Sequence, residues 1–324
     1  MIGVRPFVAL GVVAATLPWP LAFAQPYPAK PVRVIVAGPP GSVTDVRARW
    51  LSEKLTPALG QPVFVENRPG AGGNVGTEAA AKSAPDGYTI LLVHQGTMAI
   101  NPHVYGSTGY DPLTDFAPLT RVASNPLVLA VHPGVPVSST AELIQLAKER
   151  PGLLNYGSPG NGTPPHMAGE LFKRMAGIEV AHVPYKGGAP ALTDLVAGRL
   201  TYTIEGPAIQ LPQVKAGRLR ALAVTSRERV AALPEVPTVA ESGVPGYEYV
   251  AWTGVAAPAA TPKAIIAKLY ADIRGVLRSP ESREYFAGHG AEAGGESPEE
   301  FAAFIRAEHA KWGKVVREAG IKAE

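Results

Sequence analysis

Cysteine is missing from this chain of 324 residues. Its absence excludes disulfide bonds, thiolate metal sites and a lipid anchor attached to an N-terminal cysteine. A chain of this length can bury a sufficient apolar core without disulfides, so the absence is compatible with an exported protein.

An excess of charge of one sign is missing too. The sequence has 30 Lys and Arg against 27 Asp and Glu, which gives a formal net charge of +3. Because this charge is small and spread along the chain, it gives no electrostatic basis for binding nucleic acid. We therefore expect no nucleic-acid partner.

No hydrophobic run reaches the roughly 20 residues that a membrane-spanning helix needs. One shorter apolar run extends from Phe7 to Leu17, after the single charge of Arg5 and before Ala22-Phe23-Ala24. This order is typical of a secretory signal peptide with an Ala-x-Ala cleavage site. The sequence therefore predicts a signal peptide at residues 1–24 and a mature protein that is soluble in the periplasm.

Spacings typical of metal or nucleophile sites are also missing. The seven histidines never recur at the H-x-x-x-H or H-E-x-x-H spacing. No serine lies in a Gly-x-Ser-x-Gly elbow. The glycine run Gly70–Gly76 has Val75 where a dinucleotide fingerprint needs its third glycine. We expect no catalytic residue, no metal and no cofactor.

Glycine-rich turns are what the chain has instead. Each follows an apolar run and precedes a helix-like stretch, where backbone N–H groups and the helix dipole favour negative charge. Several such turns around one cleft would hold a small anion without catalytic machinery. The turns are Gly38–Ser42, Gly70–Gly76, Gly157–Gly162 and Lys186–Gly188.

Short β-rich runs alternate with helical patterns along the chain, which predicts a doubly wound α/β fold. Helix starts are marked at Ser139-x-x-Glu142, at Thr261-Pro262 and at Ser297-Pro298-x-Glu300. Most predicted strands are apolar on both faces, as buried parallel strands are. They are Val32–Ala37, Val63–Glu66, Thr89–Val93, Leu127–His132, Glu179–Val183, Leu200–Glu205 and Leu219–Val224.

Collinear motifs run through almost the whole mature chain. Those motifs include Leu59-Gly-Gln-Pro-Val-x-Val-Glu-Asn-Arg-Pro-Gly-Ala-Gly-Gly-Asn-x-Gly76, Leu153-x-Asn-Tyr-Gly-Ser-x-Gly-Asn-Gly162, His166-Met-Ala-Gly-Glu-Leu-Phe172 and His182-Val-Pro-Tyr-Lys-Gly187. In these motifs the chain resembles the periplasmic substrate-binding proteins of tripartite tricarboxylate transporters, often called Bug receptors.

The resemblance implies a type II periplasmic-binding-protein fold, with two α/β domains joined by two crossing strands. The first domain would combine residues 25–125 and 226–324, and the second would be residues 126–225. Such receptors close on a ligand by hinge motion. The resemblance also implies a monomer that binds a small carboxylate and delivers it to the membrane subunits of a transporter.

The family holds its ligands through loop backbone, small polar side chains and ordered water, and its contact positions transfer to this chain. In the first domain they are Pro40, Gly41, Ser42, Val43, Thr44, Asp45, His94, Gln95, Gly96 and Thr97. In the second they are Ser158, Gly160, Asn161, Gly162, Thr163, Tyr185, Lys186 and Gly187, while Glu205 and Trp252 would border the cleft.

Two departures from the family pattern concern the ligand. The chain has Ser42-Val43 where the family usually has Gly and a variable residue, and Glu205 where an aspartate is common. An apolar Val43 would favour an aromatic or longer-chain carboxylate over a short dicarboxylate. At Lys186 the glycines alongside favour a backbone contact over an ammonium contact. Two other functions stay open: a sensory binding protein acting on a membrane sensor kinase, and an exported enzyme on the same fold.

Overall fold

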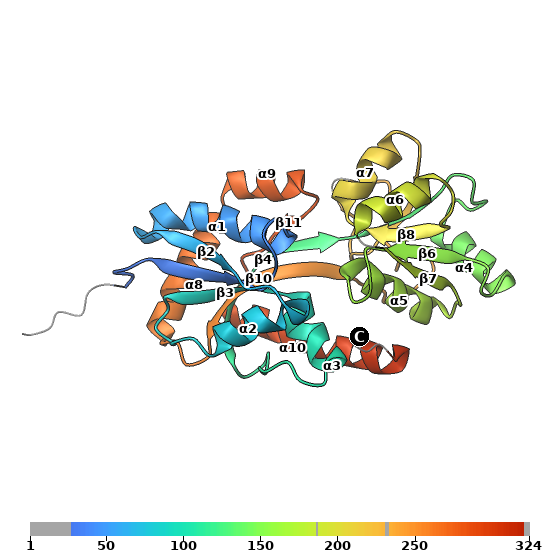
Figure 1. The fold of residues 1–324 in the computed structure, drawn as a ribbon. Helices are drawn as coiled ribbons and strands as arrows, with labels where there is room; N and C mark the ends of the chain where they lie inside the picture. Colours follow the sequence, from blue (N-terminus) through green and yellow to red (C-terminus); the bar gives the residue numbers. More distant parts are fainter. Residues whose placement is uncertain (1–26, 186, 231–232, 321–324) are drawn as a thin grey trace, which may run out of the picture.

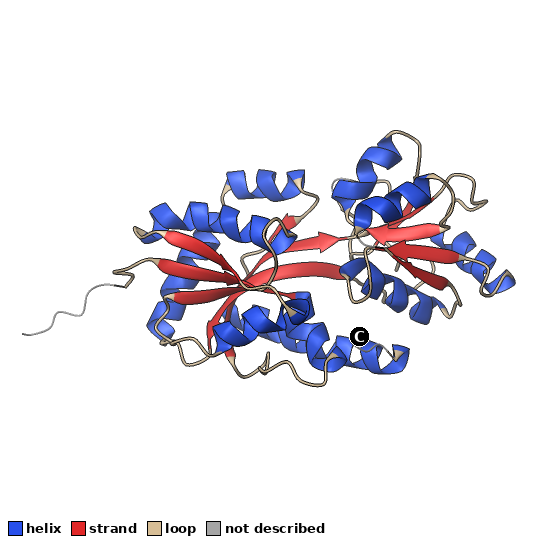
Figure 2. Ribbon diagram, viewed as in Figure 1, coloured by secondary structure: helices blue, strands red, loops and turns tan. Residues whose placement is uncertain are grey.

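Two separate β-sheets organise the chain in the computed structural model, which describes residues 27–185, 187–230 and 233–320. The predicted signal peptide and Lys186 lie outside the described residues. Figure 1 shows the sheets as the centres of two lobes, and Figure 2 shows helices packed around each sheet. The doubly wound α/β architecture predicted from the sequence is confirmed.

The first lobe is built on a six-stranded sheet of order β11-β4-β10-β3-β1-β2. Strands β1, β2 and β3 run parallel, whereas β10 is antiparallel to β3 and β4 is antiparallel to β10. The strands are β1 (Val32–Val36), β2 (Val63–Asn67), β3 (Thr89–His94), β4 (Phe116–Pro126), β10 (Val250–Pro258) and β11 (Glu292–Ala293).

Helices cover both faces of this sheet because its central strands β1 and β3 are apolar on both sides. Val34 and Val36 pack with α1, α8 and α9, while Ile35 and Val93 pack with α2 and α10. The helical segments are α1 (Val43–Leu59), η1 (Ala71–Gly73), α2 (Asn74–Ala81), η2 (Gly96–Ile100), α3 (Asn101–Val104), α8 (Lys263–Leu277), α9 (Pro280–Gly288) and α10 (Pro298–Ala319).

The second lobe is built on a five-stranded sheet of order β7-β6-β8-β5-β9. Helices α4 and α5 pack on one face with Tyr156 and Tyr202, and α6 and α7 pack on the other with Ala130. The elements are β5 (Val128–Val131), α4 (Thr140–Glu149), β6 (Asn155–Ser158), α5 (Pro164–Ala176), β7 (Ala181–Pro184), α6 (Gly188–Val196), β8 (Tyr202–Glu205), α7 (Pro207–Lys215) and β9 (Arg220–Val224).

Two crossing segments join the lobes. The chain leaves β4 and enters β5 through Leu127, and it returns at Tyr249 into β10. Thr225 ties the two segments together, because it exchanges hydrogen bonds with Leu127 and accepts one from the Tyr249 N–H at 2.8 Å. Two crossing strands are what the sequence resemblance implies.

The return crossing lies later in the chain than the predicted limit at residues 225 and 226. Val239 and Tyr247 are buried in the core cluster of the second lobe, together with Tyr156 and Tyr202. In packing terms the segment before Tyr249 therefore belongs with the second sheet. The domain limits themselves stay a prediction.

The predicted helix starts hold with two local differences. Ser297 forms a complete capping box with Glu300 at the start of α10. At α4 the Ser139 hydroxyl accepts from the Glu142 N–H, but the Glu142 carboxylate binds Ser138 and not Ser139. At α8 the N-cap is Pro262 instead of the predicted Thr261, whose hydroxyl donates to the Pro258 carbonyl.

Candidate functional site

The carboxyl ends of the parallel strands in both lobes lie at the sheet edges where the chain crosses. In the second lobe Glu205, at the end of β8, pairs with Val128, the first residue of β5 after the crossing. In the first lobe His94, at the end of β3, pairs with Thr253 of β10 close to the return crossing. Ligands of open α/β sheets bind outside the carboxyl ends of strands. The loops at these ends therefore form the candidate site.

The loop between β1 and α1 presents a glycine turn at the start of a long helix. Gly41 has a φ of +79°, a left-handed conformation that favours glycine. Ser42 is the N-cap of α1, and its hydroxyl accepts from the Asp45 N–H and lies 3.0 Å from the Thr44 hydroxyl. Pro40 and Gly41 are exposed at the tip of the loop.

Asp45 holds this loop from inside. Its buried carboxylate accepts hydrogen bonds from the Gly41 N–H, the Arg49 guanidinium and the Asn67 amide, each at 2.9 Å. Burial alone would raise the pKa of Asp45, but these hydrogen bonds outweigh it and lower the pKa. The sequence did not single out Asn67, which also donates to the Gly38 carbonyl and so fixes both ends of the turn.

Val43 is open to solvent at the first position of α1. Its side chain is 64% exposed, and Val46, one turn further along, is 43% exposed. A side chain packed under the loop against its own helix would be buried. The exposure therefore places apolar surface beside the Gly41 turn, as the departure from the family pattern suggests.

The loop after β3 uses most of its side chains internally. The His94 ring accepts from the Gly96 N–H at 3.1 Å, and burial lowers the pKa of His94 to about 4. Gln95 is 3% exposed and binds the Glu308 carboxylate and the Tyr249 hydroxyl. Thr97 is fully buried, and its hydroxyl donates to the His94 carbonyl. Gln95 and Thr97 are therefore closed to side-chain contact with a ligand, and the half-buried His94 is the least enclosed of the three residues.

The loop between β6 and α5 has two glycines in left-handed backbone, Gly160 with a φ of +136° and Gly162 with a φ of +73°. The Gly160 carbonyl accepts from the Thr163 hydroxyl at 2.7 Å, and Thr163 is the N-cap of α5. Asn161 and Gly162 are exposed at the tip. Ser158 is 1% exposed and lies 2.7 Å from the His182 ring, so its hydroxyl faces the inside of the lobe.

The loops after β7 and β8 lie next to each other. Gly187, the N-cap of α6, has a φ of +116°, and its N–H donates to the Pro159 carbonyl at 3.1 Å. A Cβ on Gly188 would lie 3.3 Å from the Glu205 carboxylate. Burial raises the pKa of Glu205 to about 7, although a hydrogen bond from the Gly206 N–H lowers it. Tyr185 points its hydroxyl at Asp194, 2.8 Å away.

Trp252 belongs to the interior of the first lobe. Its side chain is 2% exposed and packs edge-on against Phe301 and Phe304. Its indole N–H donates to the buried carboxylate of Glu308 at 3.3 Å. The Trp252 ring is therefore not open to a ligand in this conformation, which differs from its predicted place at the border of the cleft.

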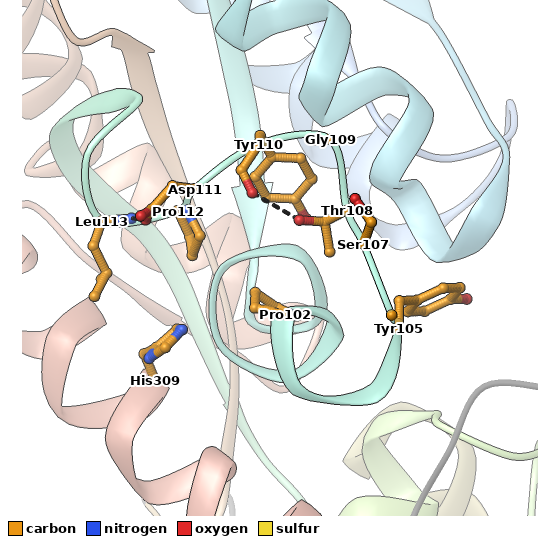
Figure 3. A pocket seen from close by; sticks show the side chains of 11 residues that line it. Pro102, Tyr105, Ser107, Thr108, Gly109, Tyr110, Asp111, Pro112, Leu113 and His309 are labelled. Atoms are coloured by element: carbon orange, nitrogen blue, oxygen red, sulfur yellow. Dashed lines mark hydrogen bonds between the residues drawn. The ribbon is translucent and has the colours of Figure 1, made fainter.

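The loop at Gly70–Gly76 is also tied inward, since the Asn101 amide donates to the Gly72 carbonyl at 3.0 Å. A cavity of about 420 Å³ lies beyond this region and shares no residue with the predicted site. In Figure 3 a Thr108 hydroxyl that donates to the Tyr110 carbonyl borders it. Its lining residues are Pro102, Tyr105–Leu113 and His309.

Within residues 27–185, 187–230 and 233–320, no group of three His, Cys, Asp or Glu side chains could hold a metal ion. Over the same residues, every helix is too short or too polar to cross a membrane.

Comparison with known proteins adds family context to this geometry. A family profile described as the tripartite tricarboxylate transporter family receptor matches residues 47–321. The chain is 40% identical to the protein BugT of Bordetella pertussis over 317 residues, which cover 98% of this chain and 96% of BugT.

Two solved structures share the fold and carry ligands. Rpa4515 of R. palustris, solved with adipate, is 40% identical with a TM-score of 0.77, over 91% of this chain and 99% of that one. MatC of Rhodopseudomonas palustris, with bound malate, is 30% identical with a TM-score of 0.73, over 90% of this chain and 100% of that one. Both ligands are dicarboxylates.

Proposed function

The chain belongs to the tripartite tricarboxylate transporter family of receptors, and we propose that it binds a small carboxylate between its two lobes and delivers it to the membrane subunits of such a transporter. The observation that carries the proposal is the meeting of glycine turns and helix starts at the crossing edge of both sheets. The helix N-termini that follow these turns favour an anion, because the positive end of the helix dipole lies there. Adipate in Rpa4515 and malate in MatC support the carboxylate class.

The proposed site combines four loops. Residues 40–45 and 94–97 come from the first lobe, and residues 158–163 and 185–187 come from the second, with Glu205 alongside. Because the loops belong to different lobes, the ligand would be enclosed by hinge rotation about the crossings at Leu127 and Tyr249. In this reading the two lobes are the two domains, joined by those crossings.

Binding without turnover is part of the proposal. Ser158 and His182 lie 2.7 Å apart, as a nucleophile and a base would. The serine is 1% exposed, however, and burial lowers the pKa of His182 to about 4, which makes the ring a poor base at neutral pH. The Glu170 carboxylate binds the Tyr156 hydroxyl and Lys173, so it does not orient the His182 ring. The pair is better suited to holding the loop than to attacking a substrate.

A ligand panel tests the proposal. The mature chain, which starts at Gln25, would be titrated with adipate, malate and benzoate and followed by calorimetry and thermal shift. A ligand at a hundred times its Kd stabilises the native state by about 2.7 kcal/mol, so a true ligand raises the melting temperature. The ligand should be recovered unchanged after long incubation. Conversion in proportion to protein concentration would favour the enzyme instead.

We propose export to the periplasm from the predicted signal peptide, and a transporter partner from the family. Intact-mass measurement of periplasmic extract should find a chain starting at Gln25, and a membrane-bound product that keeps residues 1–24 would contradict this. Delivery to a transporter is distinguished from sensing by the neighbouring genes. Transporter membrane subunits favour the proposal, whereas a sensor kinase and its response regulator favour the sensory alternative.

A further inference from the structure

A column of four rings runs beneath the loop 158–163. His182, Tyr156 and Tyr202 are register neighbours on β7, β6 and β8. The His182 and Tyr156 rings stack with centroids 4.8 Å apart, and the Tyr156 and Tyr202 rings stack at 5.4 Å. His166 of α5 completes the column, because its ring stacks on that of His182 at 4.2 Å.

The two imidazoles hold the loop at its two ends. At the start, the Ser158 hydroxyl lies 2.7 Å from Nε2 of His182, whichever atom carries the hydrogen. The same hydroxyl accepts from the Gly160 N–H at 3.2 Å. At the end, Nδ1 of His166 accepts from the Gly162 N–H at 3.0 Å. An imidazole nitrogen can accept a hydrogen bond only while it carries no proton.

We propose that His166 and His182 are positioning residues for the loop 158–163, and that the His166 ring holds Gly162 in the binding conformation only while it is neutral, so that acid loosens the ligand site. A proton on Nδ1 of His166 would place two donors face to face and release Gly162. A second positive charge 4.2 Å away would repel the first. The inference rests on the proposed function, because it concerns the same site.

The charged groups around the rings shift the pKa of each histidine in opposite directions. On α5, Glu170 and Lys173 are paired at 2.8 Å, and the Glu170 carboxylate also accepts from the Tyr156 hydroxyl of β6. Glu170 favours a positive charge on both rings, and Lys173 opposes it. Among the other packed elements, β8 contributes Tyr202, and the segment before the return crossing contributes Tyr247, whose hydroxyl donates to the Ala168 carbonyl.

Desolvation decides the balance. Burial is the largest influence on both rings and lowers the pKa of His166 and that of His182, the latter to about 4. The start of α5 disfavours a cation at His166 as well, because helix N-termini are electropositive. Both rings are therefore neutral at pH 7. The loop should respond as the pH falls from the ordinary histidine range, near 6.5, toward 4.

The test compares wild type with His166→Asn. Asparagine can still accept from the Gly162 N–H through its side-chain oxygen, but it cannot be protonated. The matched control is His289→Asn, since His289 is exposed at the C-cap of α9. Amide spectra and hydrogen exchange of Gly160 and Gly162 would be followed without ligand from pH 7 to pH 4. Adipate affinity would be measured over the same range.

In wild type and the control, the amides of Gly160 and Gly162 should lose protection from hydrogen exchange in acid. Their adipate affinity should also fall more steeply with falling pH than that of His166→Asn, with an additional loss of up to about tenfold per pH unit. Protonation of adipate itself is common to all three proteins and cancels. Equal pH profiles for wild type and His166→Asn would overturn the proposal, as would a Gly162 amide that is unchanged at pH 4. If no protein binds adipate at pH 7, the choice of ligand fails, while the ligand-free spectra still decide the role of the histidines. Should His166→Asn fold poorly, the wild-type imidazole titration decides the question alone.

Discussion

Replacing Asp45 with asparagine should loosen the ligand loop of the first lobe and destabilise the protein by about 2 kcal/mol. One carboxylate oxygen accepts from both Gly41 and Arg49, and the other accepts from Asn67. The asparagine oxygen can replace only one of them, so its amide group must face a donor. Hydrogen bonds to a charged group contribute about 1.5–3 kcal/mol. The share of Arg49 is smaller, because its side chain is 54% exposed and screened by water.

Urea denaturation and thermal unfolding would measure the loss, with an expected fall in melting temperature of roughly 4–8 °C. Glu53→Gln is the matched control, since Glu53 lies on the same helix with a side chain that is 72% exposed. Calorimetry with adipate should show weaker binding for Asp45→Asn alone. The pKa of Asp45 is lowered in the folded state, so its stabilisation is present above the ordinary carboxylate range, near 4, and is lost in stronger acid. A variant within about 0.5 kcal/mol of wild type, with unchanged affinity, would refute the reasoning.

Three further predictions concern neighbouring positions. Arg47→Met should cost about 1–3 kcal/mol in denaturation experiments, because it leaves the buried Thr253 hydroxyl and the Asn125 amide of the crossing strands without their donor; an unchanged midpoint would contradict this. Ser42→Gly with Val43→Gly should shift preference in a thermal-shift panel from aromatic toward short dicarboxylates, since one buried valine side chain is worth on the order of 1 kcal/mol or more. An unchanged ranking would exclude Val43 from the ligand contact. Gly187→Val should weaken adipate binding more than Lys186→Met, because valine is strained at a φ of +116°, and the reverse order in calorimetry would indicate a direct lysine–carboxylate pair.

Short apolar runs located seven of the strands. Burial on both faces gives a clear local signal in central strands such as β1, β3, β5 and β8, whereas the edge strands β2 and β7 are apolar runs without a fully buried residue. The crossing strands β4 and β10 were not predicted from the sequence. Strand β4 is partly polar, because it contains Arg121, Ser124 and Asn125. It lies between β10 and the edge strand β11, which has only two residues. Its partner β10 pairs with it from more than a hundred positions along the chain. Apolar character also carries no information on direction, so the expectation of mostly parallel strands did not single out β5, which runs antiparallel to both of its neighbours, β8 and β9.

The family resemblance identified the candidate loops, which periodicity alone could not do. It could not show which side chains of these loops already form hydrogen bonds inside the protein. Gln95 and Trp252 both donate to Glu308, which lies 213 positions from Gln95 in the chain. Ser158 likewise forms a hydrogen bond inside its lobe, with His182. Histidines without a metal or catalytic spacing gave no reason to place two rings beneath a glycine loop. Such partners arise from packing between distant elements, and no local pattern encodes them.

Helix α10 bears directly on how the lobes can move. Its first half packs Phe301 and Ile305 into the first lobe, and its second half packs Trp312 into a cluster that joins Ile100 of the first lobe to Phe172 of the second. Figure 1 shows α10 passing from one lobe to the other beneath the crossing strands. The helix is therefore a third connection between the lobes, in addition to the two crossing segments.

Glu308 lies where α10 changes lobes. Its carboxylate, on a residue 6% exposed, accepts from Gln95 at 2.8 Å, Trp312 at 3.1 Å and Trp252 at 3.3 Å. Gln95 in turn accepts from the Tyr249 hydroxyl at the return crossing at 2.7 Å. Any rotation of one lobe against the other must either carry this network as a unit or separate buried polar groups, each at a cost of about 1–3 kcal/mol. Because moving the network as a unit avoids that cost, we expect the loop 94–97 to move with α10 and the return crossing during hinge closure, and the loops of the second lobe to move toward it.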